Sequence, residues 1–190
     1  DWLQIFLQSE TADAIWFTVW QAALSTIICL LLGIPGAYIL YRRRFFGQRF
    51  IRALITVPLV LPTIIVAIAF SNFRDLPAIP AIIAAHVFVN YSITVRTIGG
   101  VWATMDNETE EAAELAGAGR FRTLISISLP QLKPAVVSAA ALTFLFCSTS
   151  YGVILVLGGG MVNSIETEIS AAAVQFLDLG KAAGLAILQT

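Results

Sequence analysis

The chain has 190 residues, of which 58% are hydrophobic and 12% are charged, and its net charge is −1. Its mean hydropathy is +0.84. Because a soluble domain carries about 25% charged residues, this composition excludes a soluble globular protein, and it equally excludes the disordered, collagen-like and disulfide-scaffold classes. Two cysteines and one histidine cannot assemble a Cys/His metal cage, so no metal site is predicted.

Charged residues are absent from long stretches of the chain, and a helix needs roughly 20 apolar residues to cross a hydrocarbon core. We therefore expect an all-α membrane protein, with residues 1–190 forming a single domain of about five core transmembrane helices. A short helix within residues 1–13 is expected to lie in the outer interface. The predicted spans cover residues 14–41, 51–70, 80–99 and 134–157, and a fifth, 182–190, is cut short by the end of the chain.

Prolines interrupt the first two predicted spans. Pro35 lies between Gly33 and Gly36, so a kink or a close helix contact is expected near the inner end of the first span. Pro58 and Pro62 share one face of the second span because they are four residues apart. This pair has two interpretations, a bend beside a pathway or ordinary helix packing, and both remain open at this point.

Some polar side chains fall within the predicted spans. A polar group in hydrocarbon is costly unless it is paired, which makes each one a candidate for a solute pathway. The alternative is that the histidine bonds a neighbouring carbonyl and that the hydroxyls bond back to their own helix. The candidate pathway-lining residues are His86 and Asn90, on one face of the third span, and Ser148, Thr149, Ser150 and Tyr151 in the fourth.

The basic residues predict the orientation of the chain, because Lys and Arg are retained on the cytoplasmic side during insertion. With the N-terminus outside, every basic residue except Arg74 and Lys181 is cytoplasmic. The polar segment 101–133 is then a cytoplasmic loop, whereas Asp75 and Glu166 are external. No basic patch remains for nucleic acid, so the expected surroundings are a lipid membrane.

Residues 108–134 contain the parts that a coupling element outside the membrane needs: an amphipathic helix, a sharp turn and a firm return to the spans. Ala112 and Ala113 offer a small surface for close packing beside a group of acidic residues. Gly117 and Gly119 allow the chain to turn through positive φ. Pro134 stands where a following helix can start.

At these residues the chain resembles the membrane permease subunits of binding-protein-dependent ATP-driven importers, the ABC importers. Their hallmark is Glu-Ala-Ala, three residues, Gly, nine residues and Ile-x-Leu-Pro, and every fixed position matches. The resemblance implies a type I permease-like helical bundle whose loop docks into a cleft of an ATPase subunit. The implied ATPase-coupling residues are Glu111 at the docking contact, Ala112 and Ala113 for close approach, Gly117 at the turn, and Ile127, Leu129 and Pro130 in the return to the membrane.

The resemblance also implies partners: ATP-binding cassette ATPase subunits, an extracytoplasmic solute-binding protein, and a second permease half, fused or separate, in the bacterial inner membrane. The chain has no Gly-x-x-x-x-Gly-Lys-Ser/Thr loop, so ATP is expected to be bound and hydrolysed by a partner. We expect neither enzyme activity nor a cofactor in this chain. The alternative is a secondary transporter or channel subunit not driven by ATP, and co-purification of an ATPase separates the two.

Further segments resemble the N-terminal half of two-repeat permeases of the thiamine type, a group often labelled ferric-iron permeases. They are residues 41–45, 86–90, 157–160 and 178–183. This narrower resemblance implies thiamine as the solute, with ferric iron second. It also implies that the chain is a fragment, or one half, of a two-repeat permease.

Overall fold

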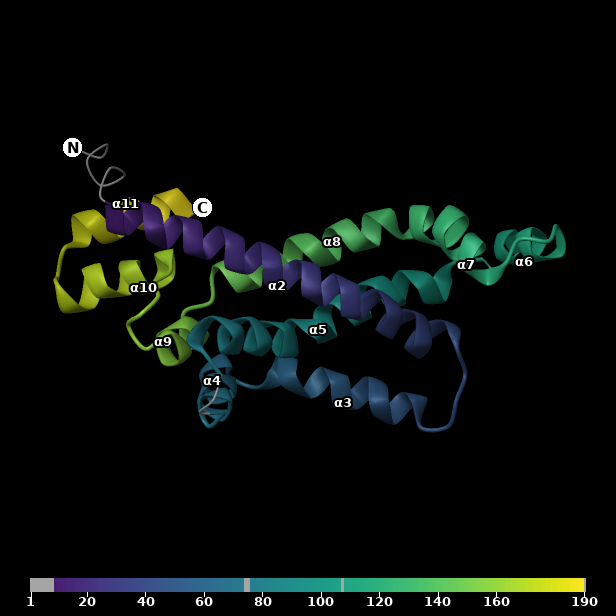
Figure 1. Cartoon of the computed structure of the whole chain (residues 1–190), viewed down its shortest axis with the longest axis horizontal. Helices are drawn as coiled ribbons and strands as arrows, with labels where there is room; N and C mark the ends of the chain where they lie inside the picture. The colour runs from purple at the N-terminus through teal and green to yellow at the C-terminus, as the bar shows by residue number, and fades with distance from the viewer. Residues whose placement is uncertain (1–8, 74–75, 107, 190) are drawn as a thin grey trace.

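The computed structural model describes residues 9–73, 76–106 and 108–189, and every regular element within these ranges is helical, so the predicted all-α class is confirmed. The molecule is elongated, with its long helices running along its length (Figure 1). In chain order the elements are α2 (Ser9–Arg42), α3 (Gln48–Val60), α4 (Thr63–Ser71), α5 (Ala78–Thr104), α6 (Glu108–Leu115), α7 (Arg120–Thr123), the π-helix η1 (Leu124–Ser128), α8 (Leu129–Ser148), α9 (Gly152–Gly158), α10 (Ile165–Ser170), the π-helix η2 (Ala171–Gln175) and α11 (Leu179–Gln189).

Helices α2, α5 and α8 pack against one another along the molecule and form its centre (Figure 1). Their inner ends share an apolar cluster built around Trp102, Ile98 and Leu132, all fully buried. Small residues bring the helices close: Ala37 and Ala139 belong to the same cluster. Helix packing in lipid depends on such close approach, because lipid tails compete equally for apolar side chains.

The span predicted over residues 51–70 is broken rather than continuous. The structure has two helices, α3 and α4, bent by 94° at a short break. Pro62 has no N–H to continue the helix, and it restricts the residue before it to extended backbone. Leu61 accordingly has φ −70° and ψ 137°. Of the two interpretations of the prolines, the bend is the one that the structure shows.

The prediction of one span over residues 134–157 is wrong. The helix begins earlier, at Leu129, and ends at Ser148, and the separate helix α9 begins at Gly152. The hydroxyls of Ser148 and Thr149 both donate to the carbonyl of Leu145, at 3.0 and 2.8 Å. Such side-chain bonds compete with the helix ladder, which explains why the polar run ends the helix.

The remaining predicted elements differ from the structure mainly in length. The first and third spans correspond to α2 and α5, which are longer than 14–41 and 80–99, and the expected interfacial helix 1–13 lies largely outside the described residues. The fifth span corresponds to α11. In the described part of the chain three helices are long and apolar enough to cross a membrane, or up to four if the bent pair is one span, against the five expected.

The two ends of the molecule differ in the way that the charge pattern predicts. The turn between α2 and α3, with α6 and α7, lies at one end, and α10 and α11 lie at the other (Figure 1). Arg43 and Arg122 therefore lie at the opposite end from Glu166. Asp75, the other residue predicted to be external, is outside the described residues. The basic end is the one expected in the cytoplasm.

Candidate functional site

The predicted coupling loop forms a compact unit at the basic end of the molecule, built from α6, α7 and η1 (Figure 1). Asp106 precedes it, and its carboxylate accepts a hydrogen bond at 3.0 Å from the backbone N–H of Glu108, the first residue of α6. A carboxylate at this position satisfies a helix N–H that has no partner within the helix. The polar segment thus forms a helix where the sequence predicted one.

The turn after α6 depends on Gly117, whose φ is +89°. The N–H of Ala118 donates to the carbonyl of Ala113 at 2.9 Å, and the N–H of Ala116 donates to the carbonyl of Ala112 at 3.0 Å. The first of these is the six-residue bond of a Schellman motif, with glycine in the left-handed position after the helix. Ala112 and Ala113 therefore also supply the carbonyls that close the turn.

The outer surface of the loop combines an acidic residue with apolar ones. Glu111 and Ala112 are exposed. Leu115 on α6 and Phe121 on α7 have exposed fractions of 90% and 75%, and a hollow of about 350 Å³ lies between the Gly117 turn and η1. Exposed apolar side chains outside the lipid are candidate contacts for a protein partner. The sequence analysis missed Phe121, although it is an apolar residue in a polar segment.

The return to the membrane is the π-helix η1, which contains Ile127 and ends just before Leu129. The N–H of Leu129 donates to the carbonyl of Leu124, five residues back. Pro130 has no N–H for the carbonyl of Ser126, so the ordinary four-residue ladder cannot continue through this point. Ile127 and Leu129 are half-buried, whereas Pro130 is exposed.

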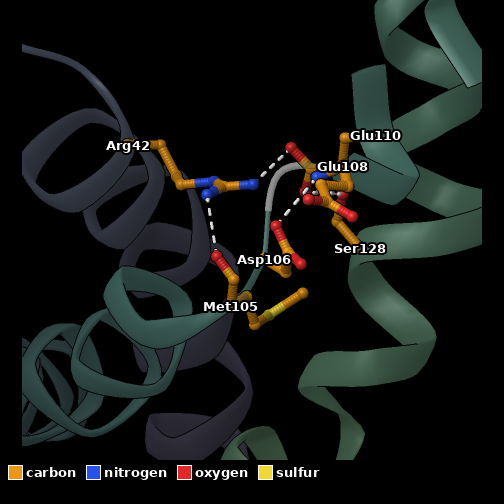
Figure 2. Close-up of polar contacts among 6 residues, drawn as sticks. All are labelled: Arg42, Met105, Asp106, Glu108, Glu110 and Ser128. Carbon is orange, nitrogen blue, oxygen red and sulfur yellow. Dashed lines mark hydrogen bonds and ion pairs between the residues drawn. The ribbon is translucent and has the colours of Figure 1, made fainter. Parts of the chain in front are cut away.

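A polar network joins the loop to the ends of the long helices (Figure 2). One carboxylate oxygen of Glu110 forms an ion pair with Arg42, the last residue of α2. The other accepts a hydrogen bond from Ser128 Oγ at 2.7 Å. Arg42 also donates to the carbonyl of Met105, directly after α5, at 3.5 Å. The sequence analysis did not predict these contacts: Arg42 and Glu110 are 68 residues apart, and such a pair carries no local signal of its contact.

A second site lies where the break between α3 and α4 and the break between α8 and α9 face α5. A cavity of about 560 Å³ is bordered by residues at the α3–α4 break and at the α8–α9 break. Ser148, predicted to line the pathway, is not among its lining residues; its hydroxyl bonds to its own helix. The predicted residues that the cavity does bring together are His86, Asn90, Thr149, Ser150 and Tyr151.

His86 and Asn90, which line this cavity, are held by hydrogen bonds. Nδ1 of His86 lies 3.0 Å from Oε1 of Gln21, and Nε2 of Gln21 donates to the carbonyl of Cys147 at 2.9 Å. Nδ2 of Asn90 donates to the carbonyl of His86 at 3.0 Å. Gln21, which the sequence analysis missed, thereby links α2 to α5 and to the end of α8.

The model of the family described as "Binding-protein-dependent transport system inner membrane component" matches residues 29–188. The chain belongs to this permease family. The predicted family is thus confirmed, and with it the location of a multi-pass protein in the inner membrane.

Two kinds of curated relative bear on this permease. The molybdate/tungstate permease WtpB of Thermococcus kodakarensis is 34% identical over 149 residues, which are 76% of this chain and 60% of that protein. The thiamine permease ThiP of Escherichia coli K12 is 27% identical and aligns with all of this chain and 39% of its own length. The chain thus spans less than two thirds of either relative.

Solved permeases share the fold. A chain of the inward-facing methionine ABC transporter MetNI superposes with a TM-score of 0.75 at 17% identity, covering 96% of this permease and 91% of that chain. A chain of a bacterial ABC importer of alginate gives a TM-score of 0.77 at 14% identity, covering 98% of this permease and 76% of that chain. The predicted permease-like helical bundle is therefore confirmed.

Proposed function

We propose that this permease forms part of the solute pathway of an ATP-driven importer and that α6 couples it to a cytoplasmic ATPase subunit. The observation that carries the proposal is the loop itself: an exposed helix that presents Glu111 and apolar side chains and ends in the Gly117 turn. A secondary transporter or channel, the alternative, has no need of such a docking surface.

The proposal includes the partners that a permease of this kind needs. ATP-binding cassette subunits bind and hydrolyse ATP at the cytoplasmic end, so this chain is not itself an enzyme and carries no cofactor. A solute-binding protein delivers solute at the end formed by α10 and α11. A second permease half, fused or separate, completes the pathway. Family membership supports this set.

Glu111→Lys tests the docking contact. We expect ATPase association to weaken by about 2 to 5 kcal/mol, the usual loss when one partner of an interfacial charge pair is removed. Glu111 is exposed and its helix lies outside the central bundle, so the amount of protein in the membrane should stay normal. The measurement is co-purification of the ATPase subunits, together with stimulation of ATP hydrolysis by the loaded binding protein.

The control for this test is Glu166→Lys, the same charge reversal at the opposite end of the molecule. It should leave ATPase association intact. Normal co-purification and normal stimulation with Glu111→Lys would show that Glu111 is not at the docking contact. An unmodified protein that transports solute without any ATPase would favour the secondary transporter or channel.

We infer that the cavity between the two breaks belongs to the solute pathway. Irregular backbone at membrane depth is tolerated only where it is buried in protein or lines a water-filled cavity, and both breaks border this one. Among the residues that the structure describes, its lining has hydroxyl, amide and imidazole groups but no Asp, Glu, Lys or Arg. Such a lining holds a solute by hydrogen bonds rather than by a fixed opposite charge.

For the solute we propose a tetrahedral oxyanion of the molybdate or tungstate class. Neutral hydroxyl and amide donors suit anionic oxygens, and the relative with the higher identity is a molybdate/tungstate permease. Thiamine is the second candidate, supported by the alignment of the whole chain with a thiamine permease. Ferric iron, the second solute expected from the sequence, has no counterpart among these relatives.

Thr149→Cys tests the pathway and the solute together. Thr149 is exposed and lines the cavity, whereas the native Cys29 and Cys147 are fully buried. We expect a small impermeant thiol reagent to block import in the variant, and molybdate to protect the new thiol more than thiamine does. Val137→Cys, on an exposed face of α8, is the control and should stay active. Import that resists the reagent in Thr149→Cys would contradict the pathway assignment, and protection by thiamine alone would reverse the order of solutes.

A further inference from the structure

We propose that Arg42, Glu110 and Ser128 form a latch that ties the coupling helix α6 to the ends of α2, α5 and α8 and transmits movement between them. The inference rests on the proposed function, since it concerns how the docked helix moves the bundle. It adds a positioning role for residues outside the Glu-Ala-Ala motif. Glu110 directly precedes that motif.

The latch links α6 directly to the long helices. In the described residues α6 packs against α7 and η1, and its contacts with α2, α5 and α8 are sparse by comparison. One oxygen of the Glu110 carboxylate binds Arg42 at the end of α2 (Figure 2). The other binds Ser128, the last residue of η1, which directly precedes α8. Arg42 extends the connection to α5 through the carbonyl of Met105.

Partial burial makes this network stronger than an ordinary surface ion pair. The exposed fractions of the Arg42 and Glu110 side chains are 12% and 22%, and that of Ser128 is 2%. Exposed pairs contribute little because water and salt screen them, whereas a hydrogen bond to a charged group is about twice as strong as a neutral one. Glutamine at position 110 would have one acceptor oxygen in place of two, so either Arg42 or Ser128 would lose its partner there.

The elements that the latch joins are themselves firmly packed. Trp102 and Leu132 are fully buried, and the cluster to which they belong also includes Met105 and Leu124 at its edge. Packed helices move as rigid units because interiors resist compression. A displacement of α6 therefore passes through Glu110 to three helix ends at once, instead of being absorbed by the turns on either side.

Charge exchange between the two ends of the ion pair tests the latch. Arg42→Glu and Glu110→Arg should each lower the solute imported per ATP hydrolysed by about tenfold, the factor that corresponds to losing a hydrogen bond to a charged group. The double variant rebuilds the ion pair, but a carboxylate at position 42 cannot donate to the carbonyl of Met105. It should therefore restore the ratio in part, to at least about threefold above either single variant. ATPase co-purification should persist in all three, because the exposed docking residues are unchanged. The measurement uses the assembled transporter in vesicles with its loaded binding protein.

Matched controls separate the latch from general changes in charge. One such control is Arg44→Glu, which makes the same charge reversal at an exposed position two residues from Arg42 and should leave the ratio unchanged. If the single reversals do not accumulate in the membrane, Ser128→Ala and Glu110→Gln replace them, and each should lower the ratio severalfold.

Two results overturn the latch: single variants that import at the unmodified ratio, or an exchanged pair that stays as defective as the single variants. A purely structural brace predicts lower protein levels with an unchanged ratio, and that result also contradicts the proposal. Failure of the proposed function looks different, because the unmodified permease would then not co-purify with an ATPase.

Discussion

Gly117→Val is expected to remove most solute import while the amount of permease in the membrane stays near normal. Gly117 has φ +89°, a region that a β-branched residue rarely adopts. Holding valine there costs roughly 1–3 kcal/mol, and the turn can relieve this strain by breaking the bond from Ala118 to Ala113. The loop lies at the end of the molecule, so the long helices should pack as before (Figure 1). Import, ATPase co-purification and membrane level are the three measurements.

The control for this prediction is Gly119→Ser. A Cβ at either glycine would meet nothing within 4 Å, so crowding is the same, but Gly119 is not in the positive φ region. Gly117→Asn should keep more activity than Gly117→Val, because asparagine tolerates the left-handed conformation. Unchanged import with Gly117→Val would show that the turn after α6 does not need its left-handed residue.

Gly33→Leu is expected to prevent accumulation of folded permease. Gly33 is buried where α2 packs on α5, and a Cβ there would lie 2.9 Å from Cβ of Thr94 and closer still to its Cγ2. Thr94 is fully buried, and its hydroxyl lies 3.3 Å from that of Thr143 on α8, so it has no room to retreat. Adding a few methylene groups to a well-packed core costs about 1–3 kcal/mol. Leucine adds a much larger volume, so its cost in stability is greater. The measurements are the membrane level and the melting temperature of the purified protein.

Gly100→Leu is the control, because a side chain at this exposed position of α5 would meet nothing within 4 Å. It should accumulate normally. Gly33→Ala should lower the membrane level less than Gly33→Leu does. Adding Thr94→Ala to Gly33→Ala should partly restore that level, because it removes the methyl group nearest to the new Cβ. A stable Gly33→Leu protein would mean that α2 and α5 are not held at this distance.

The sequence motifs were reliable where the contacts are local. The turn bonds of Gly117 join residues at most five apart, so the Glu-Ala-Ala motif already contains everything that the turn needs. A bend at Pro62 was one of the two interpretations that the sequence left open, because proline acts on its own backbone and on the residue before it. Its angle of 94° was not predictable, since the packing around α4 determines it.

The pathway candidates show the limit of local reasoning. His86 and Asn90 share a helix face by spacing alone, and the sequence could predict that much. Their meeting with Thr149 and Tyr151 in one cavity depends on the break after Ser148, which the charge-free run 134–157 concealed. Hydropathy measures how apolar a stretch is, and it does not report where serine and threonine hydroxyls compete with the helix ladder.

By itself the sequence determined the helical class, the orientation signal and the coupling motif. The reason is that lipid offers no partner for backbone N–H and C=O groups, so an apolar stretch must satisfy them within its own helix. The tertiary structure alone decided which distant residues meet: Arg42 with Glu110, Gln21 with His86, and Gly33 with Thr94. These contacts depend on the relative placement of whole helices, which side-chain shape and packing set across the bundle.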